Sequence, residues 1–431
     1  MAQNITDKNI IKNCIDISGT GYSGKKAIDN YFTLTKAGKG SYGQVYKGVY
    51  NALPPHVPQD FKLVQKHHLL SNLLKSELDK NNKIFAIKEF QSSDNDYSPD
   101  LINDEILFLQ KSMKNNLKYN CKYYGCLYAN TKTGNASAIY IIMEYIEGIN
   151  LFNYIEDNYA LDSSVYINNV LSIIKHLAKA IEELHNIDII HNDIKLENIM
   201  LIEQNKQVNI KLIDYGLCCG LENIKNTEKY CRGDVGTLEY SVAEYFDNKY
   251  KNIDKDNPKY IEMLKKKDWY AFGVVLFKLL INEIIIEKNI YNSNYLKQLD
   301  INIISDYLEN KLKSICRLLN EKFLKLINLI KYLFINKTKT ILIKTEDCIK
   351  RDIFHFLDMD NEHIKPVNCT EPVLINIEKN LFTVNSPSSK SMSAGRRKTK
   401  RQSKTGKKGN LKQDKKQSKK AIKKAIKNYN K

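Results

Sequence analysis

A polar stretch near the middle of the chain has the residue types that phosphoryl transfer requires. Asp193, Lys195 and Asn198 lie between two apolar runs, and Asp214 follows in a second acidic loop. A carboxylate can orient an attacking hydroxyl, a lysine can neutralise the moving phosphate, and Asn and Asp oxygens can bind magnesium. This spacing alone is only suggestive, so its interpretation depends on whether the rest of the chain supplies a nucleotide site.

The elements that must position these side chains can be predicted from the apolar pattern. Over 164–185 apolar residues recur with the period of an α-helix, which predicts a buried amphipathic helix leading into the polar loop. Its stripe comprises Val170, Leu171, Ile174, Leu177, Ala178, Ile181 and Leu184. A second helix is predicted after Pro99, with Glu105 beside an apolar face, and strands are predicted over 122–128 and 138–143.

A glycine-rich hairpin and a strand ending in lysine come earlier in the chain. Residues 31–34 and 45–50 alternate and carry aromatic or β-branched side chains, which predicts two strands around the glycines. Glycines allow backbone amides to approach phosphates closely. The hairpin contains Gly38, Gly40, Ser41, Gly43 and Val45. The next predicted strand, 84–88, ends in Lys88, so the order of the parts fits a nucleotide site.

Taken together and in this order, the blocks resemble the eukaryotic protein kinases. H-x-D-x-K-x-x-N at 191–198, followed by D-Y-G at 214–216, is similar to the catalytic and metal-binding loops of that family. Residues 236–244 and 268–273 are similar to the end of the activation segment and to the start of the central C-lobe helix. The resemblance covers 31–357 and implies an α+β fold with two lobes and ATP between them.

The resemblance also implies a role for each matching residue. Asp193 would be the catalytic base and Lys195 would stabilise the γ-phosphate, while Asn198 and Asp214 would hold Mg²⁺. The implied nucleotide-binding residues are Gly38, Gly40, Ser41, Gly43, Val45, Ala86, Lys88, Glu105, Met143, Glu144, Ile146 and Met200. Within this set, Glu105 would orient Lys88, Met143 would be the gatekeeper, and Glu144 and Ile146 would lie in the hinge that hydrogen-bonds adenine through its backbone.

Three positions depart from the family pattern. Asn192 replaces the arginine that normally precedes the catalytic aspartate and binds a phosphate on the activation loop, and Tyr215 replaces phenylalanine. The basic partner expected for Glu244 is not identified by the sequence. Its candidates are Arg317, Arg351 and Lys339.

The function implied is ATP- and Mg²⁺-dependent transfer of the γ-phosphate to Ser or Thr hydroxyls of protein substrates. Lys195 together with Thr237 resembles the serine/threonine branch of the family. Two alternatives stay open: a pseudokinase scaffold, and a kinase-like enzyme acting on a small molecule. Retention of Lys88, Asp193, Asn198 and Asp214 disfavours the first, and the 237–244 block disfavours the second.

Segment boundaries follow from composition and motif positions. A flexible leader is expected over 1–30 and the kinase domain over 31–357, with the N-lobe at 31–143 and the C-lobe at 147–357. An insert of about 51–83 has leucines at helical spacing. Its adjacent His67 and His68 are expected to be solvated. A linker over 358–385 leads to a basic tail.

The charge of the chain is concentrated in its tail. The formal charge is +18, and residues 386–431 carry 18 Lys or Arg and one Asp, which is +17 of that total. This segment is expected to be disordered alone. Two interpretations stay open: a solubilising extension or localisation signal, and a segment that binds nucleic acid or another polyanion without sequence preference. The apolar run 271–286 is interrupted by polar residues, so no membrane span is predicted, and we expect a monomer.

Nine cysteines are scattered, with no Cys-x-x-Cys pair, which favours reduced thiols over a disulfide framework. An intracellular location, cytoplasmic or nuclear, is expected on this basis. The abundance of Asn, Ile, Lys and Tyr together with the basic tail is similar to kinases of large DNA viruses, in which case the location would be the host cell.

Overall fold

The structure is a computed structural model. It describes residues 14–18, 26–40, 43–53, 61–91, 99–130, 137–158, 164–205, 207–221, 235–242, 258–287, 291–292, 298–299, 326, 328–330, 332–333 and 345–359. The chain divides into two compact units, Met1–Thr370 and Glu371–Lys431, and every described residue belongs to the first. The predicted tail over 386–431, and all but the first two residues of the linker, therefore lie outside the described residues.

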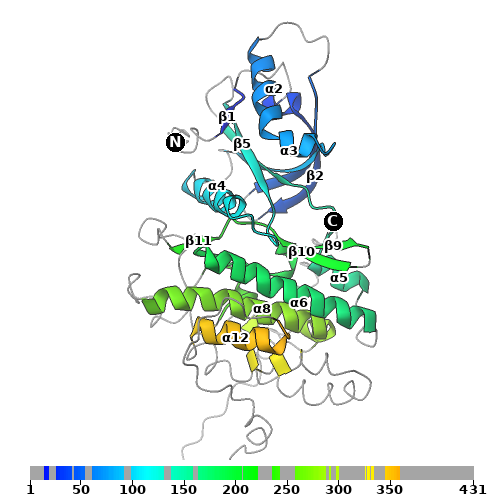
Figure 1. The fold of residues 1–431 in the computed structure, drawn as a ribbon, viewed down its shortest axis with the longest axis vertical. Helices are drawn as coiled ribbons and strands as arrows, with labels where there is room; N and C mark the ends of the chain where they lie inside the picture. Colours follow the sequence, from blue (N-terminus) through cyan, green and yellow to red (C-terminus); the bar gives the residue numbers. More distant parts are fainter. Residues whose placement is uncertain are drawn as a thin grey trace, which may run out of the picture. The chain divides into compact units, whose positions relative to one another are not determined.

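The N-terminal half of the described chain is a twisted sheet with helices packed against it (Figure 1). Six strands pair in the order β1-β5-β6-β4-β3-β2. They span Ile15–Asp16 (β1), Phe32–Gly40 (β2), Gly43–Tyr50 (β3), Ile84–Gln91 (β4), Tyr123–Asn130 (β5) and Ser137–Glu144 (β6). The helix α4, Pro99–Lys114, packs on β5. The predicted glycine hairpin is the β2–β3 pair, in which Gly40 lies opposite Gly43.

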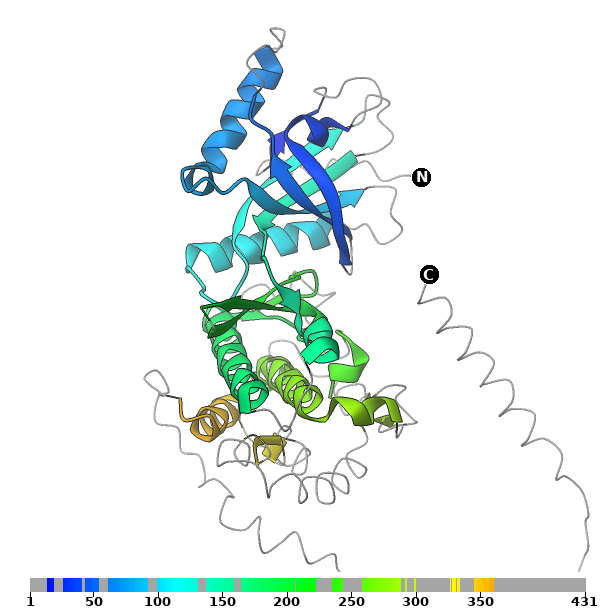
Figure 2. The same ribbon diagram turned by 90° about the vertical axis from the view of Figure 1, so that its right-hand side faces the viewer.

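The predicted insert contains two helices that pack on the outside of this sheet (Figure 2). They are α2, Phe61–Leu73, and α3, Lys75–Leu78. Leu70 and Leu74 are fully buried. The expectation of two solvated histidines is wrong for His67, which is buried with its ring centroid 4.6 Å from that of Tyr31. An amphipathic helix places neighbouring residues on different faces, so His68 is exposed while His67 faces the sheet.

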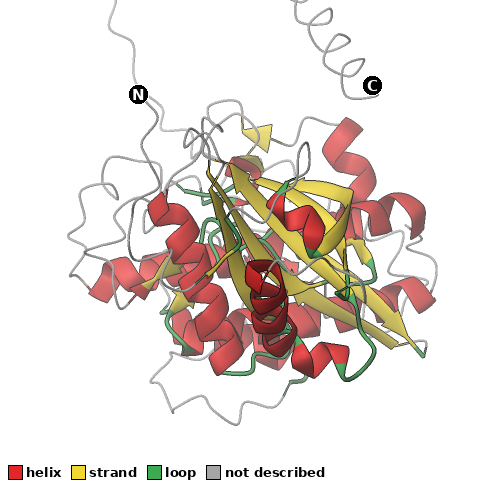
Figure 3. Ribbon diagram, turned by 90° about the horizontal axis from the view of Figure 1, so that it is seen from above, coloured by secondary structure: helices red, strands yellow, loops and turns green. Residues whose placement is uncertain are grey.

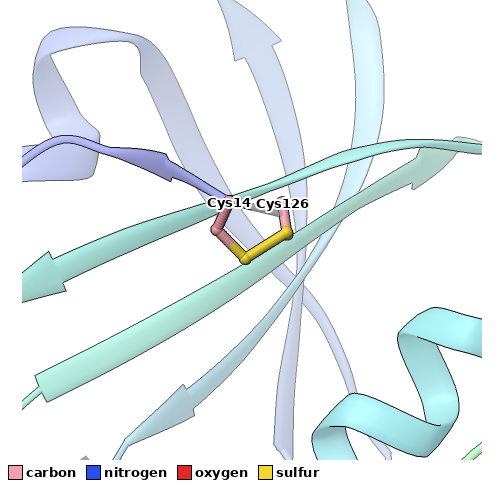
Figure 4. The surroundings of a disulfide bond; sticks show 2 residues. All are labelled: Cys14 and Cys126. Carbon is pink, nitrogen blue, oxygen red and sulfur yellow. A yellow bond between two sulfur atoms is a disulfide. The ribbon is translucent and has the colours of Figure 1, made fainter. Parts of the chain in front are cut away.

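The start of the described chain is attached to the sheet, in contrast to the flexible leader that the sequence predicts. Strand β1 pairs in parallel with Leu127 and Tyr128 of β5. A disulfide joins Cys14 to Cys126, 112 residues apart in sequence (Figure 4). The expectation of reduced thiols is therefore wrong for this pair, because the two cysteines meet only when β1 joins the sheet edge. Farther along the leader, residues 27–30 form a short 3-10 turn before β2.

The C-terminal half is mainly helical, and its helices lie below the sheet (Figures 1 and 3). They are α5, Leu151–Asn158; α6, Ser164–Asn186; α8, Pro258–Glu287; and α12, Glu346–Phe356. Helix α6 has the bounds predicted to within one residue, and it packs against α8. Helix α8 begins ten residues before the predicted start at Asp268, with proline in its first turn, where a missing N–H has no cost.

Short strands between these helices flank the polar loops at 191–198 and 214–216. They are β7, Ile149–Asn150; β8, Ile189–Ile190; β9, Ile199–Gln204; β10, Gln207–Leu212; β11, Cys219–Gly220; β12, Tyr291–Asn292; and β13, Gln298–Leu299. Strands β9 and β10 form an antiparallel ribbon, and β8 pairs with β11. The core beneath them includes Trp269, which is fully buried on α8. Among the described helices, none is long and apolar enough to cross a membrane.

Candidate active site

A buried charge cluster joins the sheet, α4 and the loop after β10. The Lys88 ammonium on β4 lies 2.7 Å from Oε1 of Glu105 on α4 and 2.9 Å from Oδ1 of Asp214. Burial favours the neutral amine, but the two carboxylates outweigh it and hold the pKa of Lys88 above its ordinary value. The predicted Lys88–Glu105 pair is therefore present, and it fixes the direction of a permanently charged lysine.

The Asp193 carboxylate is held on both oxygens. Its Oδ1 accepts hydrogen bonds from the hydroxyl of Thr237 at 2.6 Å and from the backbone N–H of Thr237 at 3.2 Å. Its Oδ2 lies 2.7 Å from the ammonium of Lys195 and accepts from the amide of Asn198 at 3.0 Å. The Lys195 ammonium also donates to the Thr237 hydroxyl at 3.2 Å. These contacts leave the carboxylate a single orientation.

The backbone of the catalytic loop is held from below by α8. Asp268 accepts hydrogen bonds from the backbone N–H groups of His191 at 2.8 Å and Asn192 at 2.9 Å. Asp268 therefore braces the backbone of the catalytic loop. Asn192 has a φ of 64°, in the left-handed region that asparagine tolerates better than most residues. The sharp bend at Asn192 directs the next residue, Asp193, toward Thr237.

A buried histidine supports this brace from the other side. Nε2 of His185 lies 3.1 Å from Asp268 and Nδ1 lies 3.3 Å from Glu346, which also accepts a 2.7 Å hydrogen bond from the Trp269 indole. Burial opposes the imidazolium form, but the two carboxylates outweigh it and raise the pKa of His185. Sequence analysis missed both His185 and Glu346, because they are 161 residues apart and match no motif.

The side chains expected to hold magnesium lie on adjoining backbone. The N–H of Ile213, directly before Asp214, donates to the Asn198 carbonyl at 3.0 Å. The Asn198 amide nitrogen donates to Asp193, which leaves its side-chain oxygen as an acceptor. Amide and carboxylate oxygens are the donors that Mg²⁺ accepts beside phosphates and water. The donor set therefore fits the ion, which Asn198 and Asp214 would hold.

Most of the other residues expected to bind the nucleotide lie on β3, β4, β6 and β9. Val45 lies opposite Lys88, and Ala86 lies opposite Met143 in the sheet register. Glu144 ends β6, and Ile146 packs against the main core in the segment that follows. The half-buried Met200 lies on β9, opposite Asn150 of β7.

At Gly43 of the glycine hairpin a side chain would not fit. A Cβ on Gly43 would lie 2.6 Å from the carbonyl oxygen of Glu89, so only glycine allows β3 this close to β4. A Cβ on Gly38 would meet no atom within 4 Å. The side chain of Gln44 donates to the carbonyl of Gly38 across the hairpin. Ser41 lies outside the described residues.

The structure describes two of the three positions that depart from the family pattern, Tyr215 and Asn192. The ring of Tyr215 is buried, and its hydroxyl donates to the Asn120 side chain at 2.6 Å, so the added oxygen is accommodated. Asn192 donates from its side chain to the carbonyl of Leu217 at 3.0 Å. Glu244, Arg317 and Lys339 lie outside the described residues, whereas Arg351 is paired with its neighbour Asp352.

Comparison with known proteins agrees with this geometry. The chain matches the model of the protein kinase domain over residues 71–345, a range that begins after the glycine hairpin. It is 33% identical over 160 residues to serine/threonine-protein kinase 1 of Heliothis zea nuclear polyhedrosis virus, covering 37% of this chain and 49% of the relative. It is 31% identical over 145 residues to serine/threonine-protein kinase PrkC of Bacillus subtilis, covering 34% and 19%.

A third relative is the liver/testis phosphorylase b kinase gamma catalytic chain of Bos taurus, 32% identical over 146 residues, covering 34% of this chain and 32% of the relative. The matches thus span half or less of each relative's length. The model of the family covers well over half of the present chain, in the region that holds the catalytic loop, α8 and the lysine–glutamate pair. The two-lobed α+β fold and these matches together place the chain in the protein kinase family.

Proposed function

We propose that the protein transfers the γ-phosphate of ATP, with Mg²⁺, to serine or threonine hydroxyls of protein substrates. The observation that carries this proposal is the bonding of Thr237 to both Asp193 and Lys195. Thr237 lies at the end of the activation segment, so the proposed peptide site adjoins Asp193, the carboxylate proposed to accept the hydroxyl proton. The serine/threonine-protein kinases among the relatives support the same acceptor class.

The residues divide the chemistry among them. Asp193 orients the substrate hydroxyl and accepts its proton as the new oxygen–phosphorus bond forms and the bond to the leaving ADP oxygen breaks. Lys195 neutralises negative charge on the phosphoryl group during transfer. Lys88 is held by Glu105 in a position to bind the α- and β-phosphates. Bound at Asn198 and Asp214, Mg²⁺ would neutralise phosphate charge. Since these charges are placed before reaction, little reorganisation is needed.

The proposal is tested with ATP, Mg²⁺ and a generic basic protein, comparing the wild type with Asp193→Asn. We expect the variant to lose at least about a hundredfold in turnover, because the amide cannot accept the proton. Asp188→Asn is a matched control, since Asp188 has a positive φ that asparagine tolerates and lies five residues before the catalytic loop aspartate. Nucleotide binding without turnover in the wild type would indicate a pseudokinase scaffold. Phosphorylation of a small molecule alone would indicate the other alternative.

Further proposals concern partners and location. The basic segment 386–431, which lies outside the described residues, is proposed to bind nucleic acid or another polyanion through its charge alone. The catalytic unit is proposed to act as a monomer. An intracellular location, in the cytoplasm or nucleus, is proposed from the scattered cysteines without a Cys-x-x-Cys pair, although Cys14 and Cys126 are joined, and the viral relative is compatible with a host cell.

A further inference from the structure

A buried lysine lies at the point where the catalytic loop meets the end of the activation segment. Lys267 is on α8, one residue before Asp268, and only 4% of its surface is exposed. Its ammonium donates to the side-chain oxygen of Asn192 at 2.9 Å and to the backbone carbonyl of Val235 at 3.1 Å. One cation therefore contacts two loops that are 43 residues apart in sequence (235 against 192).

Asn192 is the centre of this junction. Its side-chain nitrogen donates to Leu217, directly after the D-Y-G sequence, while its backbone N–H donates to Asp268. A Cβ on Gly236 would lie 2.3 Å from the Asn192 carbonyl oxygen, so the activation segment packs directly on the loop. The catalytic loop, the stretch after D-Y-G and the end of the activation segment therefore meet at Asn192. Lys267 contacts the first of these at Asn192 and the last at Val235.

Burial of the Lys267 ammonium has a cost in free energy that its hydrogen bonds must offset. Removing an ammonium from water is unfavourable even after relaxation of the protein. Hydrogen bonds to the charged group offset part of this cost. The acceptors at Asn192 and Val235 therefore help to keep the ammonium buried. Any movement of Val235 away from Asn192 would cost one of these bonds.

Lys267 and Asp268 are adjacent on α8, and both contact the catalytic loop. Asp268 holds the backbone of the catalytic loop, and the preceding residue holds the Asn192 side chain, so one turn of α8 fixes both. Thr237 comes two residues after Val235 and donates to Asp193. Fixing Val235 therefore limits where the Thr237 hydroxyl can lie relative to the catalytic carboxylate.

We propose that Lys267 is a positioning residue that fastens Val235 to Asn192 and so keeps Thr237 in contact with Asp193. This proposal rests on the proposed function for its effect on turnover. The cation that holds the end of the activation segment against the catalytic loop is then a side chain of α8. The phosphoryl acceptor site is then assembled by the chain itself, with no phosphate needed at the junction.

The test compares Lys267→Met, Lys267→Arg and Lys266→Met in the full chain. Lys266 is a matched control, because it is 6% exposed on the same helix but pairs with Glu262 one turn earlier, at 2.9 Å. The first measurement is hydrogen exchange of the backbone over 235–242. The second is kcat and KM for a peptide and for ATP. Binding of an ATP analogue gives a third reading that does not depend on turnover.

We expect Lys267→Met to speed exchange over 235–242 and to lower kcat by about tenfold to a hundredfold, because a small misplacement of catalytic groups has an effect of this size. KM for ATP should change less than about twofold, and Lys267→Arg should restore most of both quantities. Exchange over 235–242 that stays at the wild-type rate, or that rises equally in Lys266→Met, would overturn the proposal.

A second variant keeps the test decisive if Lys267→Met does not fold. Asn192→Gly removes the acceptor and tolerates the φ of 64° at this position, so it should speed exchange over 235–242 in the same way, and wild-type exchange in this variant would also overturn the proposal. Failure of the proposed function is distinguishable, since it would appear as absent turnover in the wild type. The exchange contrast between Lys267 and Lys266 variants would still decide whether the lysine holds the segment.

Discussion

The hydroxyl of Thr237 donates a 2.6 Å hydrogen bond to Oδ1 of Asp193. Replacing Thr237 by valine keeps the shape of the side chain and removes the hydroxyl, so the carboxylate loses one of the contacts that fix its orientation. We predict that kcat for peptide phosphorylation falls about tenfold to a hundredfold. Thr237→Ser, which keeps the hydroxyl, should stay within about threefold of the wild type. Equal losses in both variants would contradict this reading of the contact.

Substitutions at Lys88 and Glu105 should affect stability and activity differently. Lys88→Met leaves the Glu105 carboxylate buried without its ammonium, which costs about 3–5 kcal/mol in the free energy of unfolding, and turnover should be abolished. Adding Glu105→Gln removes the more deeply buried of the two carboxylates that Lys88 contacts and leaves Asp214, whose side chain is 13% exposed. We therefore expect the double variant to regain part of the stability, measured by urea unfolding, while turnover remains absent. Turnover that returned with stability would show that Lys88 has no role at the phosphates.

Activity should not depend on phosphorylation of the activation segment. Asn192 cannot supply the charge that arginine offers to a loop phosphate, and Lys267 already contacts this junction. Between Asp214 and Gly236 the sequence has one hydroxyl residue of the Ser/Thr type, Thr227, which lies outside the described residues. Phosphatase treatment and Thr227→Ala should each leave peptide turnover within about twofold. A protein inactivated by both treatments would disprove this prediction.

The His185–Glu346 pair should make stability depend on pH. Burial disfavours the Glu346 carboxylate, but hydrogen bonds from His185 and Trp269 outweigh it and lower the pKa of Glu346 from 4.5 to about 2. A lowered pKa contributes stability that is present above pH 4.5 and lost as the pH falls toward 2. The raised pKa of His185 has the opposite sign, so its contribution is complete below pH 6.5 and is lost at higher pH.

The pair therefore contributes most between these limits. We predict that Glu346→Gln lowers the free energy of unfolding by about 3 kcal/mol near pH 6 and by much less near pH 3, measured in urea. Asp347→Asn is a suitable control, because the Asp347 side chain is 55% exposed and should respond little. A loss in Glu346→Gln that is the same at both pH values would show that packing, not charge, is what the substitution removes.

Truncation after Asn385 should abolish binding to polyanions and leave peptide phosphorylation nearly unchanged. If the basic segment makes about six to ten phosphate contacts, the affinity of the full chain should fall about 10³–10⁵-fold between about 50 and 200 mM salt. One aromatic residue, Tyr429, is available for base stacking, so binding to sequences of different composition should be similar. Loss of peptide turnover in the truncated protein would assign the segment to the catalytic unit.

Motif spacing is enough to predict the family and to group Lys88, Glu105, Asp193 and Asp214 at one site. These residues are detectable because each sits in a short block whose local pattern also predicts a strand, helix or loop. Lys267, His185 and Glu346 cannot be predicted in this way. A lysine inside a run of three lysines looks solvated, and a histidine at the end of a helix has no sequence feature that identifies a partner 161 residues away.

The N-terminal segment escapes prediction for a related reason. Strand β1 has two residues, too few for alternation to be visible, and its stability comes from β5 and from the disulfide between Cys14 and Cys126. Burial of His67 depends likewise on Tyr31, which reaches the insert helix only after the sheet has formed. Local propensity carries no information on contacts of this length.

Strand β1 also covers backbone N–H and C=O groups at the edge of the sheet that could otherwise pair with another chain. An open edge strand exposes unpaired N–H and C=O groups, on which a strand of another molecule can add and start aggregation. Here the Tyr128 carbonyl accepts from Ile17 at 2.8 Å, and the N–H of Asn130 donates to the Ser18 hydroxyl at 2.8 Å. The protein thus shields part of β5 with its own chain, and the covalent link at Cys14 keeps that shield in place during transient opening of the edge.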